Sequence, residues 1–408
     1  MCTDCNATTP IYPEVADKMW PYAHQYFGNP SSGHIFGRPC KRSLQESRDA
    51  VAALLRAGPH ARIVFTGCGS ESDNRAIDIA IDLHRRKEKS ESKDSATVPH
   101  IVSSVIEHPA ILAYLRALEA QGEIKIDLVP VNGAGLIRVA DVLSVLRPET
   151  VLVTIMHSNN EIGTIQPISD ITAAVKKSRP DVLMHTDAAQ STGKTDVNVQ
   201  ALGVDLLTLV GHKYGAPKGI AVLFIKEGVE VPRPMLVGGG QEGGLRAGTE
   251  NMLHIVAIGE ASRIATRELV SVIRHYITLR KIMIRQLIAL DQQMRRDLQL
   301  HEQVFDVIIN TLRLSNISLL NTVSVSFRGQ SGHSMVAALG DKLIACSAGS
   351  ACFTAPADGI ACAKTSVMSH IVPEFGLGTL RLSTGRHTTI QDVESAAVIL
   401  FIKLAMGN

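Results

Sequence analysis

The chain has 408 residues, of which 45% are hydrophobic and 20% are charged, and its formal net charge is +2. This length predicts a large domain that carries a smaller one, and the composition is typical of a soluble globular protein. A nearly neutral chain gives no electrostatic argument for a nucleic-acid or membrane partner, and no apolar run is long enough to span a membrane. The seven cysteines are too sparse for a disulfide scaffold and predict no metal site, so we expect a reducing, cytoplasmic compartment.

Between about residues 60 and 230, short runs of Val, Ile and Leu alternate with amphipathic stretches, a pattern typical of buried parallel strands and crossover helices. The charged segment from Arg85 to Pro99 has no apolar period, so we expect a solvated loop insertion there. The predicted strands are Arg62 to Thr66, His100 to Ser104, Lys125 to Val129, Thr150 to Met156, Val182 to Thr186, Leu206 to Val210 and Ile220 to Lys226.

Apolar residues recur at helical spacing from about Gly259 to Leu300, which predicts long helices that leave the sheet. The remainder contains a predicted strand at Thr322 to Phe327 and further helical stretches. The sequence therefore predicts an α/β large domain over residues 22–260, with a mostly parallel sheet flanked by helices. A smaller α+β domain is expected to combine residues 1–21 with residues 261–408.

Two charged residues are predicted to follow buried strands. Lys213 comes soon after the apolar run that ends at Val210, and Asp187 follows the run that ends at Thr186. Ligands of doubly wound sheets bind beyond the carboxyl ends of the strands, so both side chains fall where a site is expected. Pyridoxal phosphate requires a lysine that forms a Schiff base with it and a carboxylate that pairs with its protonated pyridine nitrogen. The alternatives are a lysine that reaches the surface and an aspartate that caps a helix.

A third feature is the turn that contains Gly67, Gly69 and Ser70, which follows a predicted strand and opens a helix. Backbone amides at such a helix start bind phosphate, and the spacing matches neither a dinucleotide fingerprint nor a P-loop, so a small phosphate is expected. His108 and Asn160 also follow strands. His108 can stack on a cofactor ring or transfer a proton, and Asn160 can bond a cofactor hydroxyl or a substrate carboxylate. A surface histidine and a turn asparagine are the alternatives.

Three further residues are candidates for weaker reasons. Gln190 lies three residues after Asp187 and can reach a ring hydroxyl. The small residues around Cys352 can keep a thiol accessible and mobile, whereas most free cysteines are buried and inert. Arg381 can hold a substrate carboxylate with two parallel hydrogen bonds, or it forms a structural ion pair.

Taken together, these motifs resemble those of the NifS-like cysteine desulfurases and their selenocysteine lyase relatives, in the fold type I class of pyridoxal-phosphate-dependent transferases. The resemblance extends over nearly the full length of the chain. Several motifs in one order are far more specific than any one of them alone. The resemblance rests on the segments NATTP, GNPSS, FTGCGSESDN, EHPA, NNEIG, HTDAAQS, GHKYGAPKG, GGGQEGGLRAGTEN, SAGSAC and LRLSTGR.

The resemblance implies pyridoxal 5'-phosphate as the cofactor and gives each residue near its ring a role. Lys213 would form the Schiff base, and His108 would stack on the ring. Asp187 would meet the pyridine nitrogen, and Gln190 would meet the ring hydroxyl. In this assignment Lys213 and His108 both bind the cofactor and take part in catalysis.

The phosphate of the cofactor has its own set of residues in this resemblance. Gly69, Ser70 and His212 would hold it within one subunit. Thr249 would reach in from a partner subunit, which implies a homodimer with shared sites.

The resemblance also implies how the small-molecule substrate is bound and cleaved. Asn160, which contacts the cofactor as well, would bind the substrate carboxylate together with Arg381. Cys352 would attack the sulfur of L-cysteine, take it as a persulfide and release L-alanine. The persulfide sulfur could then pass to an acceptor or scaffold protein, as in iron–sulfur cluster biogenesis.

Some positions depart from the family pattern. Cys68, Gly69 and Ser70 stand where Gly-Gly-Thr or Gly-Ala-Thr is usual, and Val210 stands where many desulfurases have serine. Ser70 can replace the missing hydroxyl, so weaker or unchanged phosphate binding is expected. Pro109 stands where selenocysteine lyases commonly carry aspartate, which weakens the selenium-specific alternative without excluding it. A noncatalytic scaffold that keeps the fold is the alternative from a different functional class.

Overall fold

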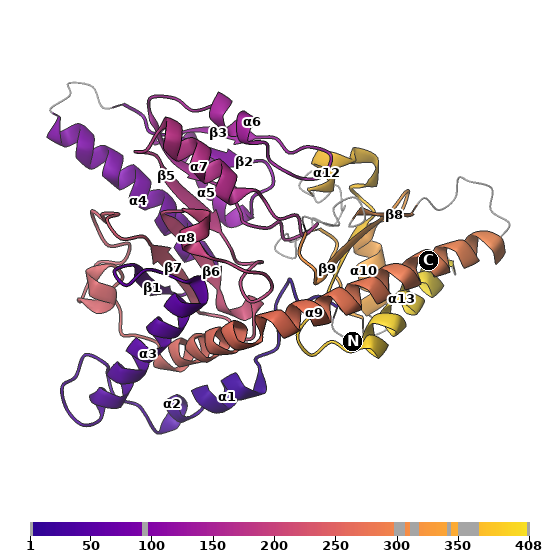
Figure 1. Cartoon of the computed structure of the whole chain (residues 1–408), viewed down its shortest axis with the longest axis horizontal. Coiled ribbons are helices and arrows are strands. Elements are labelled where there is room, and N and C mark those ends of the chain that lie inside the picture. Colours follow the sequence, from indigo (N-terminus) through magenta and orange to yellow (C-terminus); the bar gives the residue numbers. More distant parts are fainter. Residues whose placement is uncertain are drawn as a thin grey trace.

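Figure 1 shows the computed structural model of the chain, in which one long helix runs from the large sheet to a smaller sheet. The structure describes residues 3–91, 97–297, 307–310, 318–340, 344–349 and 367–405. The candidate nucleophile Cys352, and a further cysteine ten residues on, Cys362, lie outside the described residues. Within the described residues, no helix combines the length and the apolar character that a membrane span requires.

The large sheet has seven strands in the order β1-β7-β6-β5-β4-β2-β3. β7 is antiparallel to both of its neighbours, and all other neighbouring pairs are parallel, as the alternating sequence pattern predicted. The strands are β1 (Arg62–Thr66), β2 (His100–Ser104), β3 (Lys125–Val129), β4 (Thr150–Thr154), β5 (Leu183–Asp187), β6 (Leu206–Val210) and β7 (Ala221–Ile225).

Predicted and observed strand limits are identical for β1, β2, β3 and β6, and they differ by one or two residues for the other three. The difference that matters is in β5, which ends at Asp187 instead of Thr186. Asp187 is aligned with Thr208 of β6 in the parallel ladder. The aspartate is therefore fixed by the sheet itself and not by a loop after it.

Helices cover both faces of the large sheet (Figure 1). Neighbouring residues of the central strands therefore pack into different apolar clusters. Ile101 and Leu152 belong to the same cluster as Ile77 of α4, whereas Val102 and Val153 belong to the largest cluster, on the other face. The helices are α1 (Pro13–Met19), α2 (Pro21–His24), α3 (Gly37–Leu55), α4 (Gly69–Ser90), α5 (Pro109–Ala120), α6 (Val139–Ser144), α7 (Ile168–Ser178) and α8 (Val199–Leu202), with the short 3-10 helices η1 (Gly211–Lys213) and η2 (Gln241–Gly244).

The long helix α9 (Met252–Asp297) has 46 residues and spans roughly 70 Å. Ile255 and Ile258 in its first half pack into the largest cluster of the sheet domain. Leu279 and Met283 in its second half pack into the cluster of the smaller sheet. The predicted boundary at residue 260 lies inside this helix, and the domain limits stay a prediction.

The smaller sheet is antiparallel, with the strand order β10-β9-β8. Its apolar cluster includes Val325, Leu339 and Leu380. The elements of this part are β8 (Val307–Ile309), β9 (Thr322–Phe327), α10 (Gly332–Gly340), α12 (Met368–Ile371), η4 (Pro373–Phe375), β10 (Thr379–Ser383) and α13 (Ile390–Ala405).

The prediction of a loop from Arg85 to Pro99 is wrong for its first part, because α4 continues to Ser90. A helix can remain stable without an apolar period when ion pairs and buried groups anchor it. Arg86 forms an ion pair with Glu230 at 2.9 Å. Glu88 is 8% exposed, so this turn packs against the protein instead of projecting into solvent.

Residues 3–9 run between the two sheets and connect them. Cys5 N donates to Ser383 O at the end of β10 (3.0 Å), and Thr9 N donates to His212 O in η1 (2.8 Å). The N-terminal segment thereby closes over the carboxyl end of β6. This places its backbone carbonyls next to the residues that follow that strand.

Replacement of Gly215 by alanine is expected to destabilise the junction between this segment and η1. Gly215 has φ +95°, and an added Cβ would lie 2.3 Å from the ring of Tyr12. Gly228 is the matched control, because it has φ +83° and no atom within 4 Å of the added Cβ. Gly228→Ala should cost about 1–2 kcal/mol of unfolding free energy, and Gly215→Ala about 2–5 kcal/mol, measured by urea unfolding. Equal losses would contradict the close packing against Tyr12.

Candidate active site

Lys213 is the last residue of η1, which directly follows the buried strand β6. Its Nζ donates hydrogen bonds to the backbone oxygens of Asn6 (2.7 Å) and Ala7 (2.9 Å). The side chain therefore lies at the carboxyl edge of the sheet, under the N-terminal segment. This is the edge at which ligands of parallel sheets bind.

Asp187 ends β5, the strand next to β6, and is 8% exposed. Burial raises the pKa of Asp187 to about 6, although a hydrogen bond from Ala189 N and the positive charge of Lys213 act in the opposite direction. A cation bound against this carboxylate would favour its ionised form.

Gln190 belongs to the same group of side chains. Its Nε2 donates to the backbone oxygen of Asn6 at 3.0 Å, so one carbonyl accepts from both Gln190 and Lys213. Its Oε1 accepts from Nζ of Lys194 at 2.9 Å. We did not predict Asn6 or Lys194 as site residues, although the quoted segment NATTP contains Asn6 and Lys194 follows HTDAAQSTG directly.

Two histidines flank this group and are neutral at pH 7. His108 precedes α5, and its Nδ1 accepts from Ala110 N at 3.1 Å. Burial lowers the pKa of His108 to about 4, and the charge of Lys213 contributes to the same shift. Nδ1 of His212 lies 3.1 Å from Thr8 Oγ1, and burial together with Lys213 lowers the pKa of His212 to about 4.

Gly69 and Ser70 form the first residues of the 22-residue helix α4. The side chain of Cys68 precedes them and accepts a hydrogen bond from Glu71 N at 3.4 Å. A Cβ added at Gly69 would lie 2.7 Å from Val210 Cγ2, so the helix start packs tightly against the end of β6. The positive end of α4 and its free N–H groups therefore lie close to the residues that follow β6.

Arg381 lies in β10 and is 2% exposed. It donates to the backbone oxygen of Asn160 (2.8 Å), to Asp4 Oδ1 (2.7 Å) and to Ser347 Oγ (3.0 Å). The ion pair with Asp4 is the structural role that the sequence left open. Nε of Arg381 has no hydrogen-bond partner among the described residues, so the guanidinium retains a donor.

The described structure does not bring the remaining two predicted residues into this group. Thr249 is exposed on the chain surface, in the segment between η2 and α9. Cys352 lies outside the described residues, so the structure gives no position for its thiol.

The side chains at this edge fit pyridoxal phosphate by their chemistry. Lys213 provides a primary amine, Asp187 a buried carboxylate for a protonated ring nitrogen, and Gln190 an amide donor for a ring hydroxyl. Gly69 and Ser70 open a helix whose N–H groups suit a phosphate. Within the described part of the chain, no group of three or more His, Cys, Asp or Glu residues could hold a metal ion.

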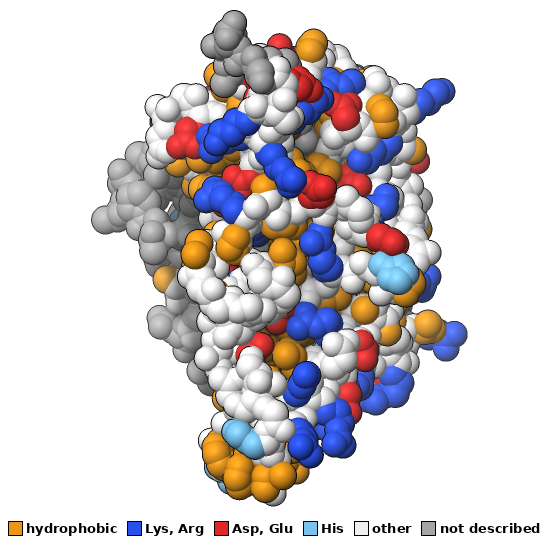
Figure 2. Space-filling model, turned by 90° about the vertical axis from the view of Figure 1, so that its left-hand side faces the viewer, with side chains coloured by type: hydrophobic (Ala, Val, Ile, Leu, Met, Phe, Trp, Pro, Cys, Tyr) orange, Lys and Arg blue, Asp and Glu red, His pale blue; other side chains and the backbone are white. Residues whose placement is uncertain are grey.

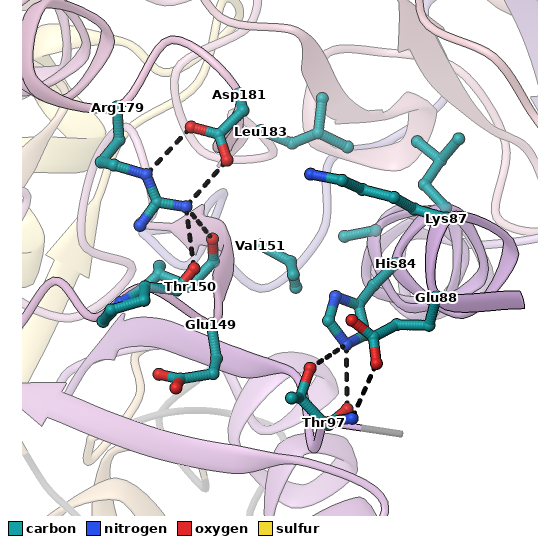
Figure 3. Close-up of a pocket in the computed structure, with 13 residues that line it drawn as sticks. His84, Lys87, Glu88, Thr97, Glu149, Thr150, Val151, Arg179, Asp181 and Leu183 are labelled. Carbon is teal, nitrogen blue, oxygen red and sulfur yellow. Dashed lines mark hydrogen bonds and ion pairs between the residues drawn. The ribbon is translucent and has the colours of Figure 1, made fainter. Parts of the chain in front are cut away.

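A cavity of about 320 Å³ lies at the opposite edge of the sheet, where β4 and β5 begin. Figure 3 shows His84 and Lys87 of α4 on one side of it and Arg179 and Asp181 on another. Nε of Arg179 donates to Asp181 Oδ1 at 2.9 Å. The described residues that line this cavity include none of the predicted site residues, so it is separate from the candidate site.

Comparison with known proteins agrees with the resemblance seen in the sequence. The family model of class-V aminotransferases matches residues 1–395. A cysteine desulfurase from Trichormus azollae is 35% identical over 403 residues, covering 97% of this chain and 91% of that protein. A solved NifS-like protein has a TM-score of 0.85 and 30% identity, covering 100% of this chain and 99% of that chain.

A further solved structure, described as SspA in complex with cysteine, has a TM-score of 0.71 and 28% identity, covering 95% of this chain and 99% of that chain. These matches confirm the predicted fold, a fold type I transferase with a mostly parallel sheet flanked by helices. The chain belongs to the class-V aminotransferase family, and within it to the NifS-like cysteine desulfurases, which are pyridoxal-phosphate-dependent enzymes.

Proposed function

We infer that this chain is a cysteine desulfurase, which converts L-cysteine to L-alanine and transfers the sulfur atom to a cysteine of its own. The observation that carries this inference is the amine of Lys213 at the end of β6, beside the buried carboxylate of Asp187 at the end of β5. The naming of near full-length relatives as cysteine desulfurases supports the reaction, and the cysteine complex of SspA supports the substrate.

Pyridoxal phosphate, when bound, supplies a sink for the electrons released at the α carbon of the substrate. Lys213 would hold it through the primary amine, and Asp187 would keep a negative charge against the ring nitrogen. The Nε2 group of Gln190 would donate to the ring hydroxyl. His108 is neutral at pH 7 because its pKa is near 4, so its ring can lie flat on the cofactor or accept a proton.

The phosphate would lie at the start of α4, where Gly69 and Ser70 present their backbone N–H groups. Ser70 is exposed, so its hydroxyl is free to turn toward an anion. His212 is half-buried and keeps an uncharged ring at pH 7, with a pKa of about 4. Neutral donors and helix amides would thus replace a salt bridge to the phosphate.

Arg381 and Asn160 would bind the carboxylate of the substrate. Nε of Arg381, which has no hydrogen-bond partner among the described residues, would be a donor for this carboxylate in addition to the ion pair with Asp4. Cys352 would then lose its thiol proton and attack the substrate sulfur. A sulfur–sulfur bond forms and the carbon–sulfur bond breaks, and its electron pair stays with the carbon, which takes up a proton. One L-cysteine and one thiol thus give one L-alanine and one persulfide, without an external oxidant.

We also propose a homodimer with shared sites. Thr249 is exposed in the single chain and would reach the phosphate of the partner's cofactor. Large apolar side chains are exposed in the segment between α2 and α3, where Phe27 is 73% and Ile35 is 68% exposed. Val237, between β7 and η2, is 88% exposed. Figure 2 shows hydrophobic side chains gathered at the lower end of the molecule, where the segment between α2 and α3 lies. Apolar groups of this size are typical of protein interfaces.

The sulfur of the persulfide has to leave Cys352 before another turnover can begin. We propose that it passes to a thiol of an acceptor or scaffold protein, by the same attack of a thiolate on sulfur. This chemistry requires reduced thiols, so the cytoplasm is the proposed location.

Lys213→Ala should remove the visible absorption band of the bound cofactor, because no amine remains to join it. Alanine formation should fall on the order of a thousand-fold or more. Lys218→Ala is the matched control, because Lys218 is an exposed lysine of the same segment, and both signals should stay. Absorption spectra and amino-acid analysis measure the two signals. A band that persists in Lys213→Ala would refute the assignment of this lysine.

Cys352→Ala should keep the absorption band but lose sulfur release from L-cysteine, because no thiol remains to take the sulfur atom. Sulfide assays in the presence of a reductant measure this loss, and Cys362→Ala should retain activity. L-selenocysteine is assayed in parallel. Turnover of L-cysteine by Cys352→Ala at the wild-type rate would contradict the persulfide step, and turnover of L-selenocysteine alone by the wild type would contradict the proposed substrate.

A further inference from the structure

Lys194 is a second lysine of the site region, and its amine is buried. The residue is 3% exposed. Its Nζ donates to the side-chain oxygens of Asn6 (2.9 Å) and Gln190 (2.9 Å). It follows Gly193, whose φ of +74° and close approach to Tyr214, 2.8 Å from an added Cβ, exclude a side chain at that position. The turn that carries Lys194 therefore packs directly against Tyr214, the residue after Lys213.

A buried lysine is costly, because burial disfavours its charged form. Burial lowers the pKa of Lys194 well below its usual value, and the charge of Lys213 contributes to the lowering. The interaction with Cys5 raises the pKa of Lys194, and the charge of Arg381 lowers it further. His212 faces the same group of charges and is neutral at pH 7, with a pKa of about 4. The acceptors that Lys194 uses are amide oxygens, so the geometry does not depend on a salt bridge.

The contact between Lys194 and Gln190 determines which end of the Gln190 amide faces which neighbour. Nζ of Lys194 donates to Oε1 of Gln190 at 2.9 Å, so the amide oxygen of Gln190, and not its NH2 group, faces the amine. The NH2 group of Gln190 then points to the carbonyl of Asn6, which also accepts from Lys213. One of its two N–H groups makes that bond, which leaves the second N–H of the amide as a donor for a bound cofactor. Rotation of the amide would bring two donors together at Lys194 and two acceptors together at Asn6.

We propose that Lys194 is a positioning residue of the cofactor site, which fixes the Gln190 amide so that its NH2 group, and not its oxygen, faces the ring hydroxyl of pyridoxal phosphate. This inference rests on the proposed roles of Lys213 and Gln190. A donor at that oxygen stabilises its anionic form. The nitrogen that joins Lys213 to the cofactor then loses its proton at a lower pH. Without the donor it should keep the proton to a higher pH.

The test is a spectrophotometric pH titration of the purified proteins with the cofactor bound. The band midpoint of Lys194→Met should lie about one pH unit above that of the wild type, because one hydrogen bond to a charged atom is lost. Lys176→Met is the matched control. Lys176 is a half-buried lysine of α7 that pairs with Asp205 at 2.6 Å, at the far edge of the sheet, so its loss should leave the midpoint unchanged.

A double variant distinguishes positioning from a direct effect of charge. In the Gln190→Ala background, Lys194→Met should no longer move the midpoint, because the amide that Lys194 orients is absent. A full shift in that background would overturn the positioning role. An unchanged midpoint in Lys194→Met alone would overturn it as well. A wild-type protein without any visible band would instead refute the proposed cofactor site.

Lys194→Met leaves the Gln190 oxygen without its donor, and this variant could fail to fold. Lys194→Gln then replaces it, because a glutamine keeps an NH2 donor one atom closer to the backbone. Its midpoint should lie between those of the wild type and the Gln190→Ala variant. A midpoint equal to that of Gln190→Ala would show that a donor at position 194 does not orient the amide.

Discussion

The candidate site depends on the contact between the amine of Lys213 and the backbone carbonyls of Asn6 and Ala7. It joins residues that lie more than two hundred positions apart in the chain. The same N-terminal segment donates to Ser383 in the smaller sheet, so it ties that sheet to the carboxyl edge of the large one. The two carbonyls give the amine of Lys213 polar partners next to the apolar strand β6. A primary amine next to a parallel sheet edge is what a covalently held cofactor needs.

Burial sets the electrostatics of the site more than pairing does. It lowers the pKa of His108 to about 4, so this histidine is neutral at pH 7, and it raises the pKa of Asp187 to about 6. Glu107 is buried close by, accepts from Met156 N, and has its pKa raised to about 8. Asp187 is the carboxylate of this group that ends a strand beside Lys213, where a cationic ring would bind. Burial likewise lowers the pKa of Lys194, whose amine has neutral amide oxygens as acceptors.

Much of the fold followed from local patterns in the sequence. Four strands have the predicted limits because Val, Ile and Leu are concentrated in them, either in a short apolar run or, in β3, alternating with charged residues. The extension of α4 to Ser90 was missed, since ion pairs such as Arg86 with Glu230 depend on tertiary structure. Lys213 and Asp187 could be predicted because they follow buried strands. Lys194 and Asn6 could not be predicted, because they are far apart in the sequence and only the folded chain brings them into contact.

We propose that Lys213, and no other lysine, holds pyridoxal phosphate in this protein. The most direct measurement is reduction of the purified protein with borohydride, which fixes the cofactor to its lysine, followed by proteolysis and mass spectrometry. We predict a phosphopyridoxyl group on the peptide that contains Lys213 and none on the peptide that contains Lys194. The label on Lys194, or an unlabelled protein after addition of the cofactor, would contradict the account.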